Sequence, residues 1–248
     1  MEEIRIILKI FEIREKHEYY GYKRITIALS KESITVNKKK VLKIMQKYDL
    51  LVKKRRKKKN FSFYKVFYIT SRLGINLIKM ISINKPFQVI HTDFTELITI
   101  SGKYYLIVYL CHYSKYVIGW DIGFGPSSEI ALKALKPVLK HLNKNSYIHQ
   151  DQGSCYTSDE YIDYLIKNNL YISYSDKAKP SDNGEIESFF GRFKKEQSSK
   201  YFKAKNIDEL KEIIDKAIHY YNHDRIHTSI KDIPYNFLSV RLFSQKTV

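Results

Sequence analysis

Apolar residues in the first third of the chain recur at helical spacing and predict three short helices. Their apolar faces comprise, in order, Ile4, Ile7, Leu8 and Phe11; Ile25 and Leu29; and Val41, Leu42, Met45 and Tyr48. Asn37 precedes the third helix and belongs to a residue type that caps helix N-termini. Three such helices with a basic exterior are typical of a helix-turn-helix-like module. A small bundle with solvated lysines is the alternative.

From residue 87 the apolar pattern changes to that of β-strands. Three closely spaced runs are rich in β-branched and aromatic residues, namely FQVIHTDF, YYLIVYLCHY and KYVIGWDIG. The segments SYIHQ and LYISYS predict two more short strands further along the chain. Helical patterns follow the third run and alternate with these later strands, so the order of elements predicts an α/β domain with a mixed sheet.

Four helices are expected in this second part. They cover residues 128–142, the segment SDEYIDYLIKNN, a long helix that ends near residue 200, and residues 207–221. Pro137 is expected to kink the first of them. Asp182 with Glu185 three residues later forms a capping-box signature, which predicts that the long helix begins there.

The charge of the chain is unevenly distributed. The net charge is +18 over 248 residues, but residues 1–86 hold 23 Lys and Arg against 7 acidic residues, whereas residues 87–248 hold 21 against 19. Residues 53–59 read KKRRKKK, a run too repulsive to pack in a core. A polyanion is therefore the expected partner of the first third, with nucleic acid favoured over a membrane surface because no strongly amphipathic basic helix is visible.

Cysteine usage and the apolar runs indicate a compartment. The two cysteines, Cys111 and Cys155, form neither a disulfide framework nor a zinc pattern, which fits a reducing environment. The N-terminus begins MEEIRI, with acids where a signal peptide has positive charge, and no apolar run approaches the roughly 20 residues of a membrane span. The expected location is the cytoplasm, with no membrane partner.

Three carboxylates occupy positions that suit a metal site. Asp93 lies near the end of the first predicted strand, Asp151 directly follows the short strand SYIHQ, and Glu187 lies in the second turn of the long helix. If the two strands are neighbours, the aspartates meet and the glutamate closes the site, which is the oxygen-ligand arrangement that Mg²⁺ prefers for phosphoryl transfer. Lys194, two turns along the helix on the same face as Glu187, is placed to reach a phosphate.

Other acids compete for these roles. Glu96 has the opposite strand parity from Asp93 and is expected to point away, and Glu185 is better used as the cap partner. Asp121 ends the third strand and is a candidate for an acid that lies close behind the site. Each of the chosen carboxylates taken singly is also compatible with an ordinary surface position, so spacing alone leaves the assignment open.

Four ordered blocks resemble a known family. The segments DFTEL, HQDQGSCYTS, SYSDKAKPSDNGEIESFFGRFKKE and YNHDRIHTSIKDIP are similar to successive blocks of the DDE transposases of bacterial insertion sequences, which are relatives of retroviral integrase. The 35 residues between Asp151 and Glu187 match the gap in that family, and YGYKRI at residues 20–25 resembles a block of its preceding helical module. The resemblance covers nearly the whole chain.

The resemblance implies a fold, a reaction and a set of residues. It implies a ribonuclease H-like core, Mg²⁺ or Mn²⁺ (two ions) held by Asp93, Asp151 and Glu187, hydrolytic nicking at element ends, and attack of the freed 3′-hydroxyl on another phosphodiester. Arg225 and His227 match the family's YNxxRxH block, either as DNA contacts or as scaffolding. The residues expected to contact DNA are Lys23, Arg24, Lys53, Lys54, Arg55, Arg56, Lys57, Lys58, Lys59, Lys194, Arg225 and His227.

The expected organisation is a basic helical DNA-binding module over residues 1–59, a linker over 60–85 and an integrase-like catalytic core over 86–248. The expected partners are the DNA at the ends of the insertion sequence and at its target, and further copies of this chain on DNA. The protein encoded by an upstream reading frame of the same insertion sequence is also expected. Two other functions are compatible with the sequence, a non-catalytic DNA-binding protein from a decayed element and a nuclease on the same fold.

Overall fold

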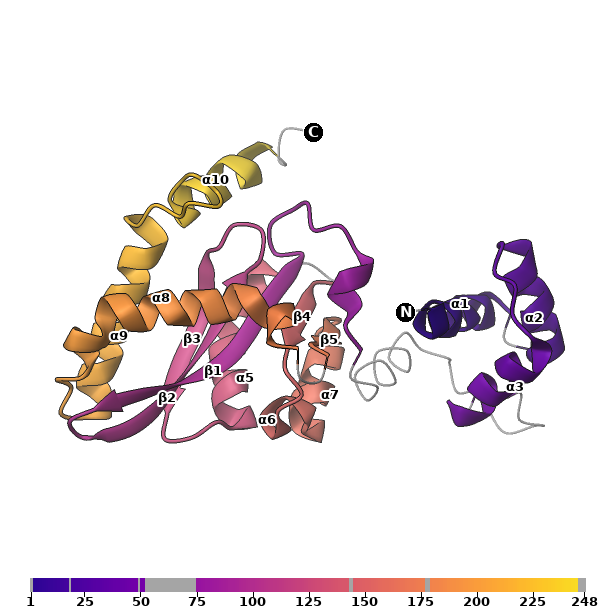
Figure 1. The fold of residues 1–248 in the computed structure, drawn as a ribbon, viewed down its shortest axis with the longest axis horizontal. Coiled ribbons are helices and arrows are strands. Elements are labelled where there is room, and N and C mark those ends of the chain that lie inside the picture. Colours follow the sequence, from indigo (N-terminus) through magenta and orange to yellow (C-terminus); the bar gives the residue numbers. More distant parts are fainter. Residues whose placement is uncertain are drawn as a thin grey trace. The chain divides into compact units, whose positions relative to one another are not determined.

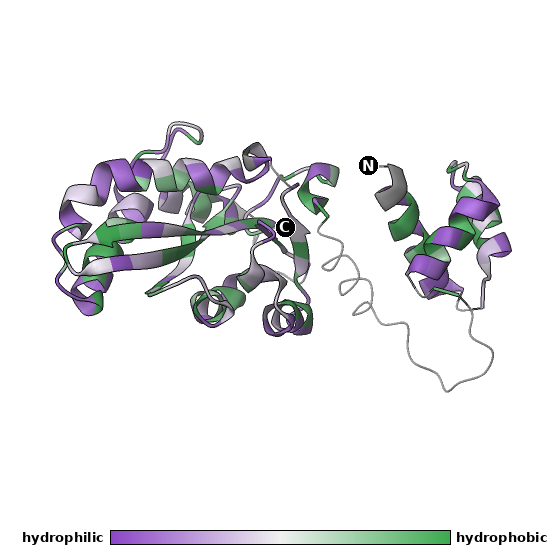
Figure 2. Ribbon diagram, turned by 60° about the horizontal axis from the view of Figure 1, so that its bottom comes forward, coloured by the Kyte–Doolittle hydropathy of each residue, from purple (hydrophilic) through white to green (hydrophobic). Residues whose placement is uncertain are grey.

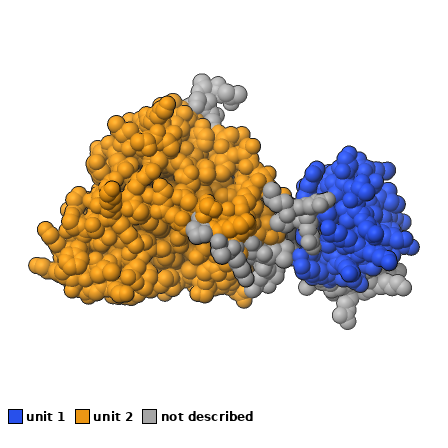
Figure 3. All heavy atoms as spheres, in the orientation of Figure 1, with its two compact units in different colours: residues 1–69 blue, residues 70–248 orange. Residues whose placement is uncertain are grey.

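The computed structural model describes residues 2–17, 19–48, 50–51, 75–142, 145–176 and 179–244. The chain divides into two compact units, residues 1–69 and residues 70–248 (Figure 3). The basic run from Lys53 to Lys59 and the first part of the expected linker, residues 60–74, lie outside the described residues. Among the described residues, no helix is both long enough and apolar enough to cross a membrane.

The part of the first unit that the structure describes contains three helices around a largely aliphatic core. They are α1 (Glu2–Lys16), α2 (Tyr22–Lys31) and α3 (Lys38–Lys47). The buried side chains that form this core include Ile6, Ile7, Ile10, Phe11, Ile13, Ile25, Leu29, Val41, Ile44, Met45 and Leu50. As predicted, Asn37 caps α3, and its side-chain oxygen accepts a hydrogen bond of 2.8 Å from the backbone N–H of Lys39.

One detail of α3 differs from the prediction. The buried positions are Val41, Ile44 and Met45, whereas Leu42 and Tyr48 are only half-buried. Residues at i, i+3 and i+4 share one face of a helix, so Val41, Ile44 and Met45 form the buried stripe. Leu42 is rotated by about 100° from Val41 and therefore lies outside that stripe. The purple and green faces of these helices in Figure 2 follow this division between polar exterior and apolar core.

The second unit is built on a five-stranded mixed sheet. Its strands are β1 (Val89–Thr99), β2 (Gly102–Cys111), β3 (Val117–Gly123), β4 (Tyr147–Gln150) and β5 (Tyr171–Tyr174), in the order β3-β2-β1-β4-β5. The pairs β1–β2 and β2–β3 are antiparallel, and β1–β4 and β4–β5 are parallel. Parallel pairing of β1 with β4 brings their carboxyl ends to the same edge, which the assignment of Asp93 and Asp151 required.

Helices cover both faces of the sheet. Helix α8 (Gly184–Tyr201) crosses one face, with α9 (Ile207–His223) beside it, and α5 (Ser128–Leu135) and α7 (Asp159–Lys167) lie on the other (Figure 1). On β2, Leu106, Val108 and Leu110 pack toward α8 and α9. The alternate residue Tyr109 points to the opposite side, where its hydroxyl donates a 3.0 Å hydrogen bond to the carbonyl of Ala131 in α5. This period-two alternation sorts the side chains of every strand onto one face or the other.

Short elements complete the unit. They are the 3-10 helices η1 (Leu77–Met80), η2 (Lys136–His141) and η3 (Pro180–Asn183), together with α6 (Ser154–Thr157) and α10 (Pro234–Ser244). The expected helix over 128–142 is α-helical only to Leu135 and continues as η2, in which Pro137 occupies the first turn. Proline lacks the N–H that an α-helix interior needs, so the predicted kink appears as a change of helix type.

Candidate active site

Asp93 faces α8 from the middle of β1. It pairs in register with Val108 of β2, whose side chain belongs to the core under α8, so the two side chains share that face. The carboxylate is half-buried, and its Oδ1 accepts a 2.7 Å hydrogen bond from the backbone N–H of Phe94. Asp93 is therefore held on the face of the sheet that α8 covers. The pairing of β1 with β4 ends at His91, two residues before Asp93.

Asp151 comes directly after β4 on the neighbouring strand. His149 of β4 pairs with His91 of β1, so Asp151 and Asp93 each follow a paired residue by two positions. The Asp151 side chain is exposed, and its Oδ1 accepts a 2.9 Å hydrogen bond from the backbone N–H of Gly153. A Cβ at position 153 would lie 2.9 Å from this carboxylate oxygen, so glycine leaves room for the turn that presents Asp151.

Glu187 lies in the first turn of α8 with an exposed side chain. The helix is anchored just beyond this turn by Phe189, Phe190 and Phe193, which pack into the core between the sheet and α9. Glu187 is thus carried on a firmly packed helix, near enough to Asp93 to act on it electrostatically.

The three carboxylates act on one another electrostatically. Burial raises the pKa of Asp93 to about 7, and repulsion from Asp151 and Glu187 contributes to the increase. A carboxylate that shares a site with others resists ionisation unless a cation is near, and oxygen-only donors suit a hard divalent ion. Within the described part of the chain, however, no three His, Cys, Asp or Glu side chains are already gathered closely enough to hold a metal ion. The donor chemistry therefore fits Mg²⁺ or Mn²⁺, while binding would require the carboxylates to draw closer together.

A layer of buried polar side chains lies beneath these acids, and sequence reasoning missed it. We call this set the histidine layer: the buried His91 on β1, His149 on β4, Asn183 at the start of α8 and Ser173 on β5, with the half-buried His112 after β2. Ring centroids of His91 and His149 are 5.1 Å apart in an edge-on arrangement. Burial lowers the pKa of His149 to about 4, and burial also lowers the pKa of His91. The signal in the sequence was the repeat of histidine two residues before each aspartate, in HTD and HQD.

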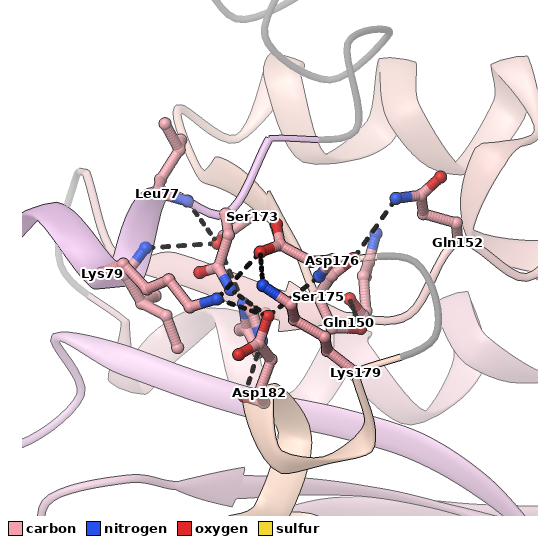
Figure 4. Close-up of polar contacts among 12 residues, drawn as sticks. Leu77, Lys79, Gln150, Gln152, Ser173, Ser175, Asp176, Lys179 and Asp182 are labelled. Carbon is pink, nitrogen blue, oxygen red and sulfur yellow. Dashed lines mark hydrogen bonds and ion pairs between the residues drawn. The ribbon is translucent and has the colours of Figure 1, made fainter. Parts of the chain in front are cut away.

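The loop from β5 to α8 is tied to η1 (Figure 4). Lys79 Nζ lies 2.9 Å from Asp176 Oδ2 and 2.6 Å from Asp182 Oδ2, and the amide of Asn76 donates to the same Asp182 oxygen at 2.9 Å. The backbone N–H of Leu77 donates a 2.9 Å hydrogen bond to Ser173 Oγ. Residues 75–80, inside the expected 60–85 linker, therefore pack against the core next to the candidate site.

The predicted capping box is wrong. No side chain caps α8; Asn183 occupies the N-cap position, Asp182 is engaged by Lys79, and Glu185 Oε2 lies 2.6 Å from Lys115 Nζ. Contacts from distant segments have replaced the local cap. The placement of Asp121 behind the acids is wrong as well. Asp121 pairs with Ile107 on the opposite face, where Lys133 of α5 lies 3.3 Å away.

The remaining candidate residues are spread over both units. Lys23 and Arg24 are exposed on α2. Lys194 lines an open groove of about 530 Å³ between α8 and the end of β1, together with Glu96, Ile98, Ser198, Ser199, Tyr201 and Phe202. Glu96 also accepts a 3.1 Å hydrogen bond from the hydroxyl of Tyr105 on β2.

Arg225 and His227 both contact α8. The guanidinium of Arg225 makes a two-pronged ion pair with Glu196, with a shortest distance of 2.7 Å from Nη2 to Oε1. His227 Nε2 lies 3.2 Å from Arg192 Nη1, and its Nδ1 lies 3.0 Å from Ser229 Oγ. Burial and the positive charge of Arg192 lower the pKa of His227 to about 4. Both side chains are thus used within the unit, between the α9–α10 connection and the outer side of α8.

Family models match both units. A model described as an HTH-like domain matches residues 2–59, and two models described as an integrase core domain match residues 83–180 and 168–234. A transposase-like protein of Haemophilus influenzae is 31% identical over 210 residues, which span 84% of this chain and 95% of that protein. The transposase of insertion sequence element IS904 from Lactococcus lactis is 29% identical, with 86% of each chain covered.

Solved structures support the fold. The catalytic core domain of HTLV-2 integrase, in complex with magnesium, aligns with a TM-score of 0.50 at 18% identity and covers 62% of this chain and 97% of that one. A chain of the simian T-cell lymphotropic virus intasome aligns with a TM-score of 0.54 at 15% identity, over 92% of this chain and 74% of that one. The ribonuclease H-like mixed sheet with flanking helices, predicted from the sequence, is confirmed.

Proposed function

Because this chain belongs to the bacterial insertion-sequence transposases that have an integrase core, we propose that Asp93, Asp151 and Glu187 are its metal-binding catalytic carboxylates. The observation that carries the proposal is the parallel pairing of β1 with β4, which sets Asp93 and Asp151 each two residues beyond the paired His91 and His149. The raised pKa of Asp93, to which Asp151 and Glu187 contribute by repulsion, agrees with it. Three acids from two adjacent strands and one helix thus lie within electrostatic reach of one another at the same edge of the sheet.

The reaction of this family is DNA transposition, and two displacement steps at phosphorus account for it. In the first step a water oxygen attacks a phosphodiester, the bond from phosphorus to the 3′ oxygen breaks, and a free 3′-hydroxyl results. In the second step that hydroxyl attacks another phosphodiester, the bond from that phosphorus to its 3′ oxygen breaks, and the strands are joined as a new 3′-hydroxyl is released. Mg²⁺ or Mn²⁺ held by the three carboxylates would supply positive charge that stabilises the attacking and leaving oxygens.

The surrounding residues of the chain orient the three carboxylates. The hydrogen bonds from Phe94 N–H and Gly153 N–H orient Asp93 and Asp151, and the phenylalanine-anchored helix holds Glu187 over them. Lys194 lies seven residues beyond Glu187 and would neutralise a phosphate of the bound strand. Catalysis of this kind depends on positioning and on charge, and needs no covalent bond between protein and DNA.

We also propose that the first unit supplies most of the affinity for DNA. Lys23, Arg24 and the Lys53–Lys59 run carry positive charge that would displace counterions from the DNA backbone. Joining two element ends requires two copies of the site, so an oligomer of this chain on DNA is the expected active form. The product of an upstream reading frame stays an expected partner, which neither the fold nor the relatives support.

The decisive experiment uses the full chain and labelled duplexes that carry the element's own ends. With Mn²⁺ we expect nicking and joining, and we expect Asp93→Asn to reduce both by about 10²–10³-fold, the usual effect of losing one group that stabilises transition-state charge. DNA binding should survive. Glu96→Gln, three residues along the same strand, is the matched control and should stay near the wild-type rate.

Three results would point elsewhere. Equal activity of wild type and Asp93→Asn would overturn the assignment of the carboxylates. Nicking without joining would indicate a nuclease on the same fold. Tight, salt-dependent DNA binding without a response to Mn²⁺ would indicate a DNA-binding protein that has lost catalysis.

A further inference from the structure

The histidine layer lies between the two aspartate-bearing strands and the start of the glutamate-bearing helix. We propose that His91 and His149 are positioning residues that fix the first turn of α8, and with it Glu187, relative to Asp93 and Asp151. The inference rests on the proposed function of the three carboxylates and adds the means by which the first turn of α8 is held in place relative to the sheet.

The two histidines form a matched pair in the sheet. They are direct partners in the parallel register of β1 and β4. Each precedes its aspartate by two residues, and side chains two residues apart point to the same face of a strand. The histidines therefore lie two residues before the acids on the face that α8 covers, where His91 is 1% exposed and His149 is fully buried.

His91 is bonded to the residue that begins the helix. Its Nδ1 lies 3.0 Å from Asn183 Oδ1, and because an amide oxygen only accepts, Nδ1 carries the proton and donates. The other nitrogen, Nε2, then accepts from Nδ1–H of His112 at 2.9 Å. Asn183 is the N-cap residue of α8, but its side chain makes no capping hydrogen bond. Its side-chain oxygen Oδ1 instead accepts a hydrogen bond from His91 on the sheet.

His149 is hydrogen-bonded to Asp182, the residue that precedes Asn183. Its Nε2–H donates to the backbone carbonyl of Asp182 at 3.1 Å, and its Nδ1 accepts from the hydroxyl of Ser173 at 2.9 Å. Ser173 Oγ in turn accepts the N–H of Leu77. Both ring nitrogens of both histidines are thus engaged in the neutral form, which leaves none free to ligate a metal and makes the layer a support instead of a second metal site.

The two donated hydrogen bonds end on consecutive residues, Asp182 and Asn183, which lie five and four positions before Glu187. Breaking either one would leave its acceptor without that donor, and the turn would shift to recover a partner. A displacement of the Glu187 carboxylate by about 1 Å is enough to cost roughly 10²-fold in rate when catalysis depends on placement. The layer therefore acts on rate through geometry, without touching DNA or metal.

The chemistry of the two rings gives a crossed test. An asparagine amide reaches about as far as Nδ1 of histidine, and a glutamine amide about as far as Nε2. His91→Asn keeps the donor to Asn183 whereas His91→Gln loses it, and His149→Gln keeps the donor to Asp182 whereas His149→Asn loses it. The ranking of Asn and Gln should therefore be opposite at the two positions.

Two measurements carry the test, both on the full chain. Hydrogen exchange of amides 184–188 in metal-free protein should be faster in His91→Gln and His149→Asn than in their matched partners. In nicking assays with Mn²⁺ and element-end DNA, the same two variants should lose about 10²-fold in kcat, with little change in the KM for DNA. His91→Asn and His149→Gln should stay within about fivefold of wild type. Melting temperatures without metal identify conditions under which all four variants are folded.

The possible outcomes separate the two claims. The same ranking of Asn and Gln at both positions would mean that only side-chain volume matters and would overturn the positioning role. Crossed exchange with uncrossed kcat would overturn it too, since α8 would then be ordered by the layer without consequence for Glu187. Asp93→Asn in the same assay tests the proposed function. If it is inactive while the crossed ranking is absent, only the positioning inference falls, and if it is fully active, both fall.

Discussion

The two units of this transposase place their functional charge in opposite ways. Among the described residues of the first unit, the buried apolar core is aliphatic apart from Phe11 and Met45, and residues such as Lys23 and Arg24 stay exposed. In the second unit, where 24 Lys and Arg are opposed by 19 acidic residues, three acids act on one another beside a buried polar layer. Function in the first unit is a sum over many side chains, whereas in the second it depends on the position of each one.

The largest effect should distinguish two glutamates on the same turn of α8. Glu187→Gln is expected to reduce strand nicking by about 10²–10³-fold without lowering the unfolding free energy, because the exposed carboxylate serves the reaction and its charge repels Asp93. Glu185→Gln should instead lower the unfolding free energy by about 1–2 kcal/mol, because the buried ammonium of Lys115 loses its charged partner. Nicking rates and urea unfolding of both variants measure this. Equal loss of activity in both would contradict the separation of roles.

The second prediction concerns Asp93 and pH. Its pKa is about 7 in the folded chain and about 3.9 in an unfolded one, so the folded state binds the proton more tightly. Ionisation of Asp93 therefore lowers the unfolding free energy of the metal-free protein as the pH rises from about 4 to about 7, and the full decrease persists above pH 7. Asp93→Asn should be more stable than wild type at pH 8 by about 2–4 kcal/mol, an upper range because the group is partly exposed.

Urea unfolding of the metal-free proteins checks this, with Glu96→Gln as the control on the same strand. The advantage of Asp93→Asn should shrink toward zero near pH 4. An advantage that grew as the pH fell would show that the repulsion among the carboxylates is absent. Added Mn²⁺ should raise the stability of wild type at pH 8 and leave that of Asp93→Asn nearly unchanged.

These differences also explain which features could be predicted from the sequence. The Asn37 cap, the β-strands and the proline kink at residue 137 depend on neighbours in the chain, and all three were predicted. The meeting of Asp93 and Asp151 was conditional on strand order, which the parallel pairing of β1 and β4 supplied. Alternation along a strand and local capping chemistry carry such information directly.

The failures share a different physical cause. Asp182 reads as a helix cap, but Lys79, 103 residues away, takes its carboxylate, and Asn183 is engaged by His91 across 92 residues. Asp121, expected close behind the acids, lies on the face that α5 covers, because one residue of strand parity decides between α8 and α5. Partners so distant leave no local pattern, so the histidine layer was visible only as two histidines that precede two aspartates.

The third prediction tests the summed charge of the first unit. The double variant Lys23→Gln, Arg24→Gln should weaken DNA binding several-fold and reduce the slope of log affinity against log salt by about 2, one for each phosphate that is no longer neutralised. Lys136→Gln, an exposed lysine of η2 in the second unit, should change neither. Fluorescence anisotropy with element-end DNA at several salt concentrations gives both quantities. A loss as large as that of a catalytic residue would show that these two side chains act by position.

The smallest effect decides between the two roles open to Arg225. Its guanidinium makes hydrogen bonds to both carboxylate oxygens of Glu196, from Nε and Nη2, and its side chain is 18% exposed. Arg225→Gln should therefore lower the unfolding free energy by up to about 1 kcal/mol, the usual limit for an ion pair near the surface. We expect the exchanged pair Arg225→Glu, Glu196→Arg to recover both that stability and the affinity for DNA, because the guanidinium is already occupied within the unit. Recovery of stability without recovery of DNA affinity would instead identify Arg225 as a DNA contact, since the positive charge would then matter at position 225 itself and not merely across the pair.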